Sequence, residues 1–136
     1  MKKIILFFLI ISAVHSENSQ KESSIFNMIA KSIASKTEPT VYIHTEIKSL
    51  QLFPGDLRIV KECKEADIVI LSTIKNIPAE CKGKLLFGTR YFHLDKRDVI
   101  GAFFWQKGRP NILFYKKRLE LNGIKLDSSY NKYIEK

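Results

Sequence analysis

The residue types that act in catalysis are present in the chain, but their spacing matches no common catalytic motif. The sequence contains no Gly-x-Ser-x-Gly elbow, no His-Glu-x-x-His pair and no phosphate-binding loop. No spacing of carboxylates singles out an acid and base pair. His44 and His93 are two lone histidines, which are typical of ordinary hydrogen-bonded residues. We therefore predict no catalytic residue, no metal ligand and no cofactor, and we expect a protein that is not an enzyme.

The first 16 residues have the composition of a secretory signal peptide. Lys2 and Lys3 precede an apolar run over residues 4–14, and residues 14–16 offer a cleavage site before Glu17. The run is too short for a membrane-spanning helix, which needs about 20 residues. We expect cleavage after residue 16, export to the periplasm and no membrane span in the mature chain. An uncleaved N-terminal anchor is the alternative.

Cys63 and Cys81 are the only cysteines of the chain. In an exported protein a disulfide between them is expected, and it would contribute about 3 kcal/mol in the chain-entropy model. A redox-active pair usually has the Cys-x-x-Cys spacing, which is absent here. Whether the bridge is structural or senses redox state stays open. A thiol-dependent enzyme with a Cys–His dyad is a further alternative, and it would need one free cysteine.

Composition and charge limit the class of protein. The chain has 136 residues, of which 45% are hydrophobic and 27% charged, as in a globular domain. We predict a signal peptide over residues 1–16, a flexible N-terminus over 17–22 and a single α/β domain over 23–136. The net charge of +9 comes from lysines spread along the chain, with no run of five. We expect no nucleic-acid partner; a solvated basic surface and an acidic partner or ligand both remain open.

Periodicity predicts the elements. Phe26, Ile29, Ala30 and Ile33 form one apolar face of a helix that we expect to begin at Ser23 or Ser24 and to end near residue 36. We predict short helices over residues 78–82, 91–96 and 116–121, and a last one that begins after Asp127. Strands are predicted over residues 41–44, 67–72, 85–87, 99–105 and 111–115, and residues 57–60 form an edge strand or a short helix.

The order of these elements predicts an α/β fold. A strand, a helix and a strand follow one another over residues 67–88, which favours a parallel pair with a right-handed crossover. Residues 99–115 predict a hairpin with a loop of about five residues. We therefore expect a three-layer-like α/β sandwich with a mixed, largely parallel sheet, a C-terminal β-hairpin and flanking helices.

Ligands of open α/β sheets bind beyond the carboxyl ends of parallel strands. The predicted strands end in polar residues there, and Glu46 follows the first of them. An arginine is a forked donor suited to a small anion, with hydroxyl groups in support. The alternative is that polar residues gather wherever strands leave a sheet. The candidate ligand-binding residues are His44, Thr45, Ser72, Thr73, Thr89 and Arg90.

The tip of the hairpin is a second candidate site. Trp105, Lys107 and Arg109 place an aromatic ring beside two cations. Tryptophan and arginine are common anchors of protein interfaces, so a protein partner would suit this surface. The alternative is a core tryptophan beside solvated cations.

The last third of the chain resembles a known family. Gly101-Ala102-Phe103-Phe104, Gly108-Arg109, Phe114, Arg118-Leu119 and the tail over residues 123–128 are similar to the YfiR-type family of small secreted bacterial proteins. A helix, a proline and a strand over residues 26–44 add to the similarity. The resemblance implies a periplasmic, disulfide-bearing domain that holds the sensory domain of a membrane-bound diguanylate cyclase in check.

The expected function is therefore that of an exported, non-enzymatic regulator. It would bind an inner-membrane signalling protein, such as a diguanylate cyclase or a sensor kinase, or a small ligand. The alternative is a small periplasmic solute-binding module for a small anion, because residues 66–71 are similar to one lobe of such proteins. The oligomeric state stays open.

Overall fold

The computed structural model describes the backbone of residues 2–136 and the side chains of residues 18–136. The side chains of the predicted signal peptide lie outside the described residues, so its cleavage stays a prediction. None of the helices in the described part of the chain combines the length and the apolar character needed to cross a bilayer.

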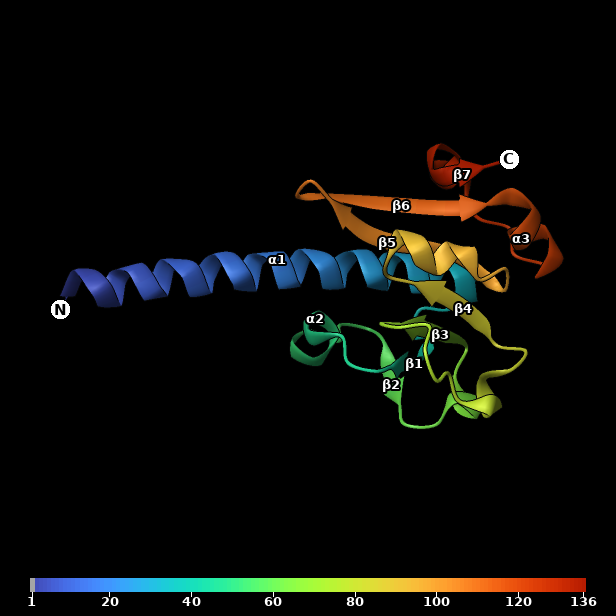
Figure 1. The fold of residues 1–136 in the computed structure, drawn as a ribbon, viewed down its shortest axis with the longest axis horizontal. Helices are drawn as coiled ribbons and strands as arrows, with labels where there is room; N and C mark the ends of the chain where they lie inside the picture. Colours follow the sequence, from blue (N-terminus) through green and yellow to red (C-terminus); the bar gives the residue numbers. More distant parts are fainter. Residues whose placement is uncertain (1) are drawn as a thin grey trace.

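A seven-stranded mixed sheet forms the centre of the molecule (Figure 1). Its spatial order is β2-β1-β3-β4-β5-β6-β7. The first five of these strands are parallel, β6 runs antiparallel to β5, and β7 is parallel to β6. This confirms the predicted α/β sandwich with a largely parallel sheet. The strands are β1 (Thr40–His44), β2 (Arg58–Val60), β3 (Ile68–Leu71), β4 (Leu85–Gly88), β5 (Val99–Gln106), β6 (Arg109–Tyr115) and β7 (Ile134–Glu135).

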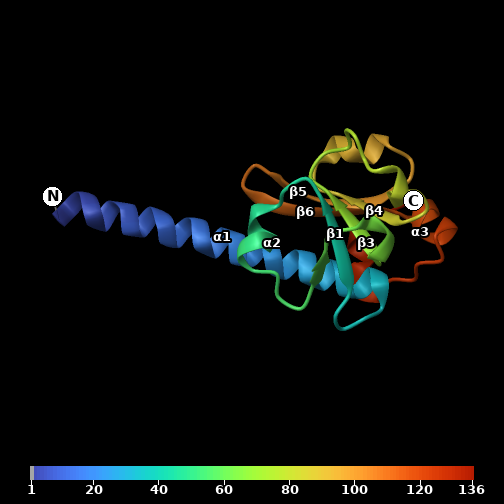
Figure 2. The same ribbon diagram turned by 90° about the horizontal axis from the view of Figure 1, so that it is seen from below.

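Two layers cover the sheet (Figure 2). The long helix α1 (Lys2–Ala34) lies across one face, and its N-terminal half extends beyond the sheet (Figure 1). Short 3₁₀ segments cover the other face: η1 (Cys63–Glu65), η2 (Ala79–Cys81) and η3 (Tyr91–Asp95). The remaining elements are α2 (Lys48–Leu52), α3 (Lys116–Leu121) and η4 (Ser128–Tyr133).

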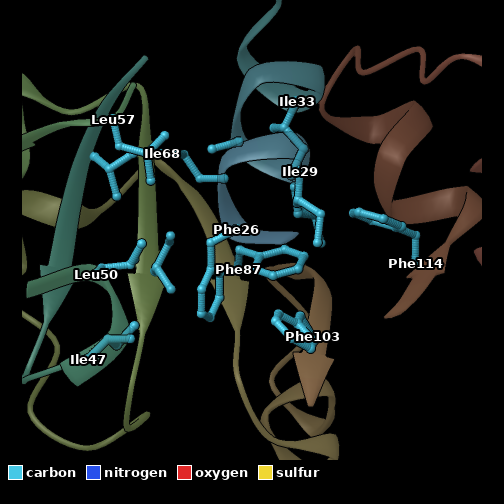
Figure 3. Packing of buried hydrophobic residues seen from close by; sticks show 14 of the residues in the cluster. Phe26, Ile29, Ile33, Ile47, Leu50, Leu57, Ile68, Phe87, Phe103 and Phe114 are labelled. Carbon is cyan, nitrogen blue, oxygen red and sulfur yellow. The ribbon is translucent and has the colours of Figure 1, made fainter. Parts of the chain in front are cut away.

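The apolar face of α1 packs as its periodicity predicts. Phe26, Ile29, Ala30 and Ile33 are all buried, and they belong to one cluster with the sheet residues that face the helix (Figure 3). Burying a side chain of this size contributes roughly 1.5–3 kcal/mol, so this face holds α1 on the sheet. The sheet side of the cluster includes Ile68, Ile70, Phe87, Phe103 and Phe114.

The predicted start of this helix is wrong. The helix is continuous from Lys2, so neither Ser23 nor Ser24 caps it. Ser23 is instead buried, and its hydroxyl donates to the carbonyl of Phe53 after α2. Residues 17–22 are helical in the full chain. Their flexibility in a cleaved chain stays a prediction.

Strand β3 is buried on both faces, as its apolar run predicts. Ile68 and Ile70 face α1, whereas Val69 and Leu71 face the 3₁₀ layer. The open question over residues 57–60 is settled, because β2 is an edge strand parallel to β1.

The hairpin turn is tighter than predicted. Gln106 pairs with Arg109, which leaves only Lys107 and Gly108 between the strands. Both turn residues have positive φ, 51° and 73°, as a two-residue type I′ turn requires. The expected loop of five residues is therefore wrong, since the ladder continues past Trp105.

Gly101 allows β5 and β6 to pack closely. A Cβ on this residue would lie 2.4 Å from Cδ1 of Phe114 and 2.7 Å from the carbonyl oxygen of Leu113. Phe114 is fully buried in the hydrophobic cluster that includes the apolar face of α1. A side chain at position 101 would therefore displace a core ring.

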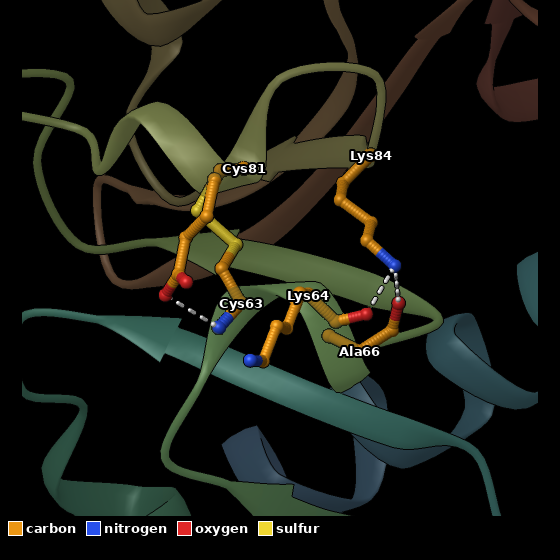
Figure 4. Close-up of a disulfide and its surroundings, with 6 residues drawn as sticks. Cys63, Lys64, Ala66, Cys81 and Lys84 are labelled. Carbon is orange, nitrogen blue, oxygen red and sulfur yellow. Dashed lines mark hydrogen bonds between the residues drawn. A yellow bond between two sulfur atoms is a disulfide. The ribbon is translucent and has the colours of Figure 1, made fainter.

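The predicted disulfide is present between Cys63 and Cys81 (Figure 4). It joins η1 to η2 inside the cluster on the face opposite α1, and both cysteines are buried. Two polar contacts support the same region. The backbone N–H of Cys63 donates to Glu80, and Nζ of Lys84 donates to the carbonyls of Lys64 and Ala66.

The C-terminal segment closes back onto α1. The predicted helix end is confirmed, because α3 stops at Leu121 and Gly123 has a φ of 66°. Asp127 caps η4 by accepting from the N–H of Ser129 at 3.0 Å. Tyr130 is buried, and its hydroxyl lies 2.7 Å from that of Ser32 on α1. Strand β7 was not predicted.

Candidate functional site

A cleft of about 170 Å³ lies beyond the carboxyl ends of the parallel strands β1, β3, β4 and β5. Helix α1 and the segment that leads from β1 into α2 both contribute to its lining. This is the position at which the sheet topology predicts a ligand. Its lining residues are Glu22, Phe26, Glu46, Ile47, Lys48, Ser72, Thr89, Arg90, Phe103 and Trp105.

The cleft combines charged, hydroxyl and aromatic groups. Lys48 and Arg90 are exposed cations, and Glu22 and Glu46 are the carboxylates. None of the salt bridges among the described residues involves these four side chains. The guanidinium of Arg90 therefore remains available for an anionic group.

Strand alternation explains which candidates meet in this cleft. Ser72 and Thr89 continue the α1-facing sides of β3 and β4, because they follow Ile70 and Phe87 by two residues. Both line the cleft, together with Arg90. Thr89 is fixed by its hydroxyl, which donates to the carbonyl of Leu71 at 2.8 Å.

The other three candidates do not line the cleft. His44 lies on the opposite face of β1, where its Nε2 is 2.7 Å from the carbonyl oxygen of Lys75. The hydroxyl of Thr73 accepts from the N–H of Lys75 at 3.2 Å. Thr45 is exposed and has a φ of 66°, which is rare for a β-branched residue. This turn carries the chain from β1 to the cleft residues Glu46 and Lys48.

His93 positions the corner that carries Thr89 and Arg90. Its Nδ1 accepts from the backbone N–H groups of both residues, at 3.0 and 3.2 Å. The ring is 1% exposed, and burial, followed by the charge of Arg90, lowers the pKa of His93 below its ordinary value of 6.5. The ring is therefore neutral at pH 7, as an accepting Nδ1 requires. Gly88 makes room for it, since a Cβ there would lie 2.7 Å from Cβ of His93.

Sequence reasoning left His93 out of the site, although a signal was available. His93 is the third residue of η3, which begins directly after Arg90. A polar side chain at this position reaches back to the N–H before a helical turn, as in a capping box. Glu22 and Lys48 were also missed, because α1 and α2 reach the cleft only through the tertiary fold.

Trp105 joins the two candidate sites. Its half-buried ring lines the cleft, and its Nε1 donates to a carboxylate oxygen of Glu22 at 2.7 Å. The same pair also borders an open neighbouring cavity of about 340 Å³ that reaches Gly108 in the hairpin turn. Lys107 and Arg109 are exposed at the tip and line neither cavity. Trp105 therefore lines the cleft, whereas the two cations of the hairpin tip do not.

The described cysteines and histidines are all engaged in contacts with other groups. Both cysteines are in the disulfide, so the Cys–His alternative lacks its thiol. His44 and His93 are each engaged by backbone groups. Within the side chains described, no three histidine, cysteine, aspartate or glutamate residues gather as a metal site.

Comparison of the chain with family models, with curated proteins and with solved structures gives no match.

Proposed function

We propose that the protein is a non-enzymatic binding domain that takes an anionic group of its partner into the cleft beside Arg90. The partner we favour is an inner-membrane signalling protein, which the domain regulates in the periplasm, as the resemblance to YfiR-type proteins implies. The observation that carries this proposal is the convergence of Arg90, Lys48, Ser72 and Thr89 at the carboxyl ends of the parallel strands.

The size of the cleft favours a group that projects from a larger partner. Its volume of about 170 Å³ is below the roughly 300–1,000 Å³ of ordinary small-molecule sites. A carboxylate or phosphate on a protruding side chain would accept hydrogen bonds from Arg90 and from the hydroxyl of Ser72, whereas the hydroxyl of Thr89 already donates to Leu71. The aromatic rings of Phe26, Phe103 and Trp105 would cover its apolar stem.

The test is recovery of a partner from detergent-solubilised envelope by the tagged protein. We expect a diguanylate cyclase or a sensor kinase to copurify with the wild type and to be lost with Arg90→Glu. Arg58→Glu is the matched control, because Arg58 is also exposed but begins β2 at the opposite end of the sheet. Arg109→Glu separates the hairpin tip from the cleft. If the partner fails to copurify with Arg109→Glu but still copurifies with Arg90→Glu, the result would contradict the proposal.

The solute-binding alternative has a distinct readout. A free anion that occupies the cleft would raise the melting temperature by linkage and would change the fluorescence of Trp105, the only tryptophan. Phosphate, sulfate and small dicarboxylates are the probes, with Arg90→Glu and Arg58→Glu as before. A response that Arg90→Glu abolishes, without any recovered partner, would favour the solute-binding module.

A further inference from the structure

A second cavity, of about 490 Å³, lies at the end of the sheet opposite the cleft, where β6 leads into α3. Four of its six lining residues are cations, and none is acidic. The lining consists of Arg97, Tyr115, Lys117, Arg118, Leu121 and Lys136. We call the cavity that these residues line the basic cavity.

The cations of the basic cavity form no salt bridge with any side chain that the structure describes. The salt bridge closest to the basic cavity in sequence joins Lys96 to Asp98 at 3.4 Å. Arg97, the residue between them in the sequence, is not part of it. Clustered like charges around a concave surface raise the local concentration of anions.

One cation is held rigidly in place. Nη1 of Arg118 donates to the carbonyls of Leu94 and Val99 at 2.8 and 2.9 Å. Its guanidinium carbon also lies 4.5 Å from the centroid of the Tyr115 ring. Its Nε and Nη2 donate to no atom among the described residues. The hydrogen bonds of Nη1 are explained by a structural role, because they hold the loop before β5. This role does not explain why three further cations surround the same cavity.

The basic cavity also has an apolar part. Leu121 is 77% exposed, the largest fraction among the exposed large hydrophobic residues of 18–136. With the ring of Tyr115 it offers a surface for an apolar group next to the cations. A ligand for this cavity would therefore carry both an anion and an apolar body.

We propose that the basic cavity binds a phosphate ester with an apolar substituent, independently of the cleft beside Arg90. A phosphomonoester carries about −1.5 to −2 charges at neutral pH, which suits four cations better than a single carboxylate does. Arginine presents donors in a fork that matches phosphate oxygens. The volume of the cavity is that of an ordinary small-molecule site.

The first experiment is calorimetric titration of the protein with phenyl phosphate. We expect tighter binding than with benzoate, which keeps the ring but has one charge, and than with inorganic phosphate, which has no ring. Arg97→Ala and Lys117→Ala should each weaken binding about tenfold, the size of one charge-assisted hydrogen bond. Leu121→Ser should weaken the binding of phenyl phosphate and leave the binding of inorganic phosphate unchanged. Arg118 is not substituted, because it supports the loop before β5.

Lys116→Ala is the matched control, because Lys116 is exposed on the same helix but does not line the cavity. Equal losses with Lys116→Ala and Lys117→Ala would mean diffuse attraction and would overturn the proposal. Vesicles of phosphatidylcholine with and without phosphatidic acid, whose headgroup is a phosphomonoester, then distinguish a lipid headgroup from a free phosphate ester. Cosedimentation that Lys117→Ala abolishes and Lys116→Ala spares would identify a lipid headgroup. Binding of neither phenyl phosphate nor vesicles would overturn the proposal.

Discussion

His93 determines the geometry of a binding surface that its own side chain does not line. The neutral ring holds the backbone of Thr89 and Arg90 through one acceptor nitrogen. Protonation of Nδ1 would replace this acceptor with a donor that faces two N–H groups. The position of Arg90 in the cleft is therefore sensitive to acid.

We predict that the folded state loses stability as the pH falls below about 6.5, and that His93→Asn flattens this loss. The pKa of His93 is lowered in the folded state, so the unfolded chain takes up a proton first, near pH 6.5. Stability is complete above that pH and falls as the pH drops through the folded pKa, by at most about 1.4 kcal/mol per pH unit. The Oδ1 of asparagine would keep the acceptor. Urea unfolding at several pH values measures the effect.

The carboxyl group of Asp67 does not account for this loss. Burial raises the pKa of Asp67, but hydrogen bonds from Lys36 and Thr40 outweigh it, and the net pKa lies below the ordinary value of 3.8. Asp67 therefore affects stability only in stronger acid. Stability curves of the wild type and His93→Asn that stay parallel between pH 7.5 and 5 would contradict the role of His93.

Three of the six candidate ligand-binding residues predicted from the sequence line the same cleft, and the other three do not. The alternation of side chains along the strands explains this difference. Ser72 and Thr89 have the parity of the residues that face α1, and Arg90 follows directly. His44 has the opposite parity on β1 and points to the other face. The sequence shows which strand residues share a face of the sheet. It does not show which face borders the cleft, because that depends on where α1 packs.

At the scale of elements, the β5–β6 turn contains an unfavourable residue. Lys107 has a φ of 51°, a region that asparagine and glycine adopt more readily than lysine. We predict that Lys107→Asn raises the free energy of unfolding by about 0.5 kcal/mol, whereas Lys107→Val lowers it by about 1 kcal/mol. Thermal melts of both variants measure this. Equal melting temperatures for the two would contradict the assigned turn.

The disulfide supplies a second prediction at this scale. Replacement of both cysteines by serine should lower the free energy of unfolding by about 3 kcal/mol, because the bridge restricts the unfolded chain. The layer made by η1 and η2 has little other regular structure to hold it. Reductant should lower the melting temperature of the wild type and leave the double variant unchanged. The absence of any shift would show that the bridge contributes neither stability nor redox sensitivity.

Prediction from the sequence succeeded for elements with strong periodicity and failed at their ends. The buried strands and the apolar face of α1 have patterns that burial requires. The predicted start of α1 and the predicted length of the hairpin loop were wrong. Ser23 bonds to Phe53 rather than to its own helix, and cross-strand pairing continues to Gln106. Strand β7 has only two residues, too few for a pattern.

At the scale of the whole molecule, the contacts of α1 predict the effect of signal-peptide cleavage. Among the α1 side chains that the structure describes, residues 18–34, burial begins at Ser23, and Glu22 accepts a hydrogen bond from Trp105. We therefore predict that the exported protein begins at Glu17 and melts at the temperature of the full chain. Intact-mass measurement of the protein from the periplasm and melts of both forms provide the test. A retained mass of 15.7 kDa would support the uncleaved anchor instead.

The contact of Tyr130 with α1 has a consequence for the time course of folding. Its hydroxyl meets Ser32 and the carbonyl of Met28 across 98 and 102 residues of chain. A chain that emerges from its N-terminus presents the apolar stripe of α1 long before Phe114 and Tyr130 are available to cover it. Such distant closures slow folding and leave apolar surface open to chaperones and to aggregation. Phe114 and Tyr130 thus complete, late in synthesis, the core that α1 begins.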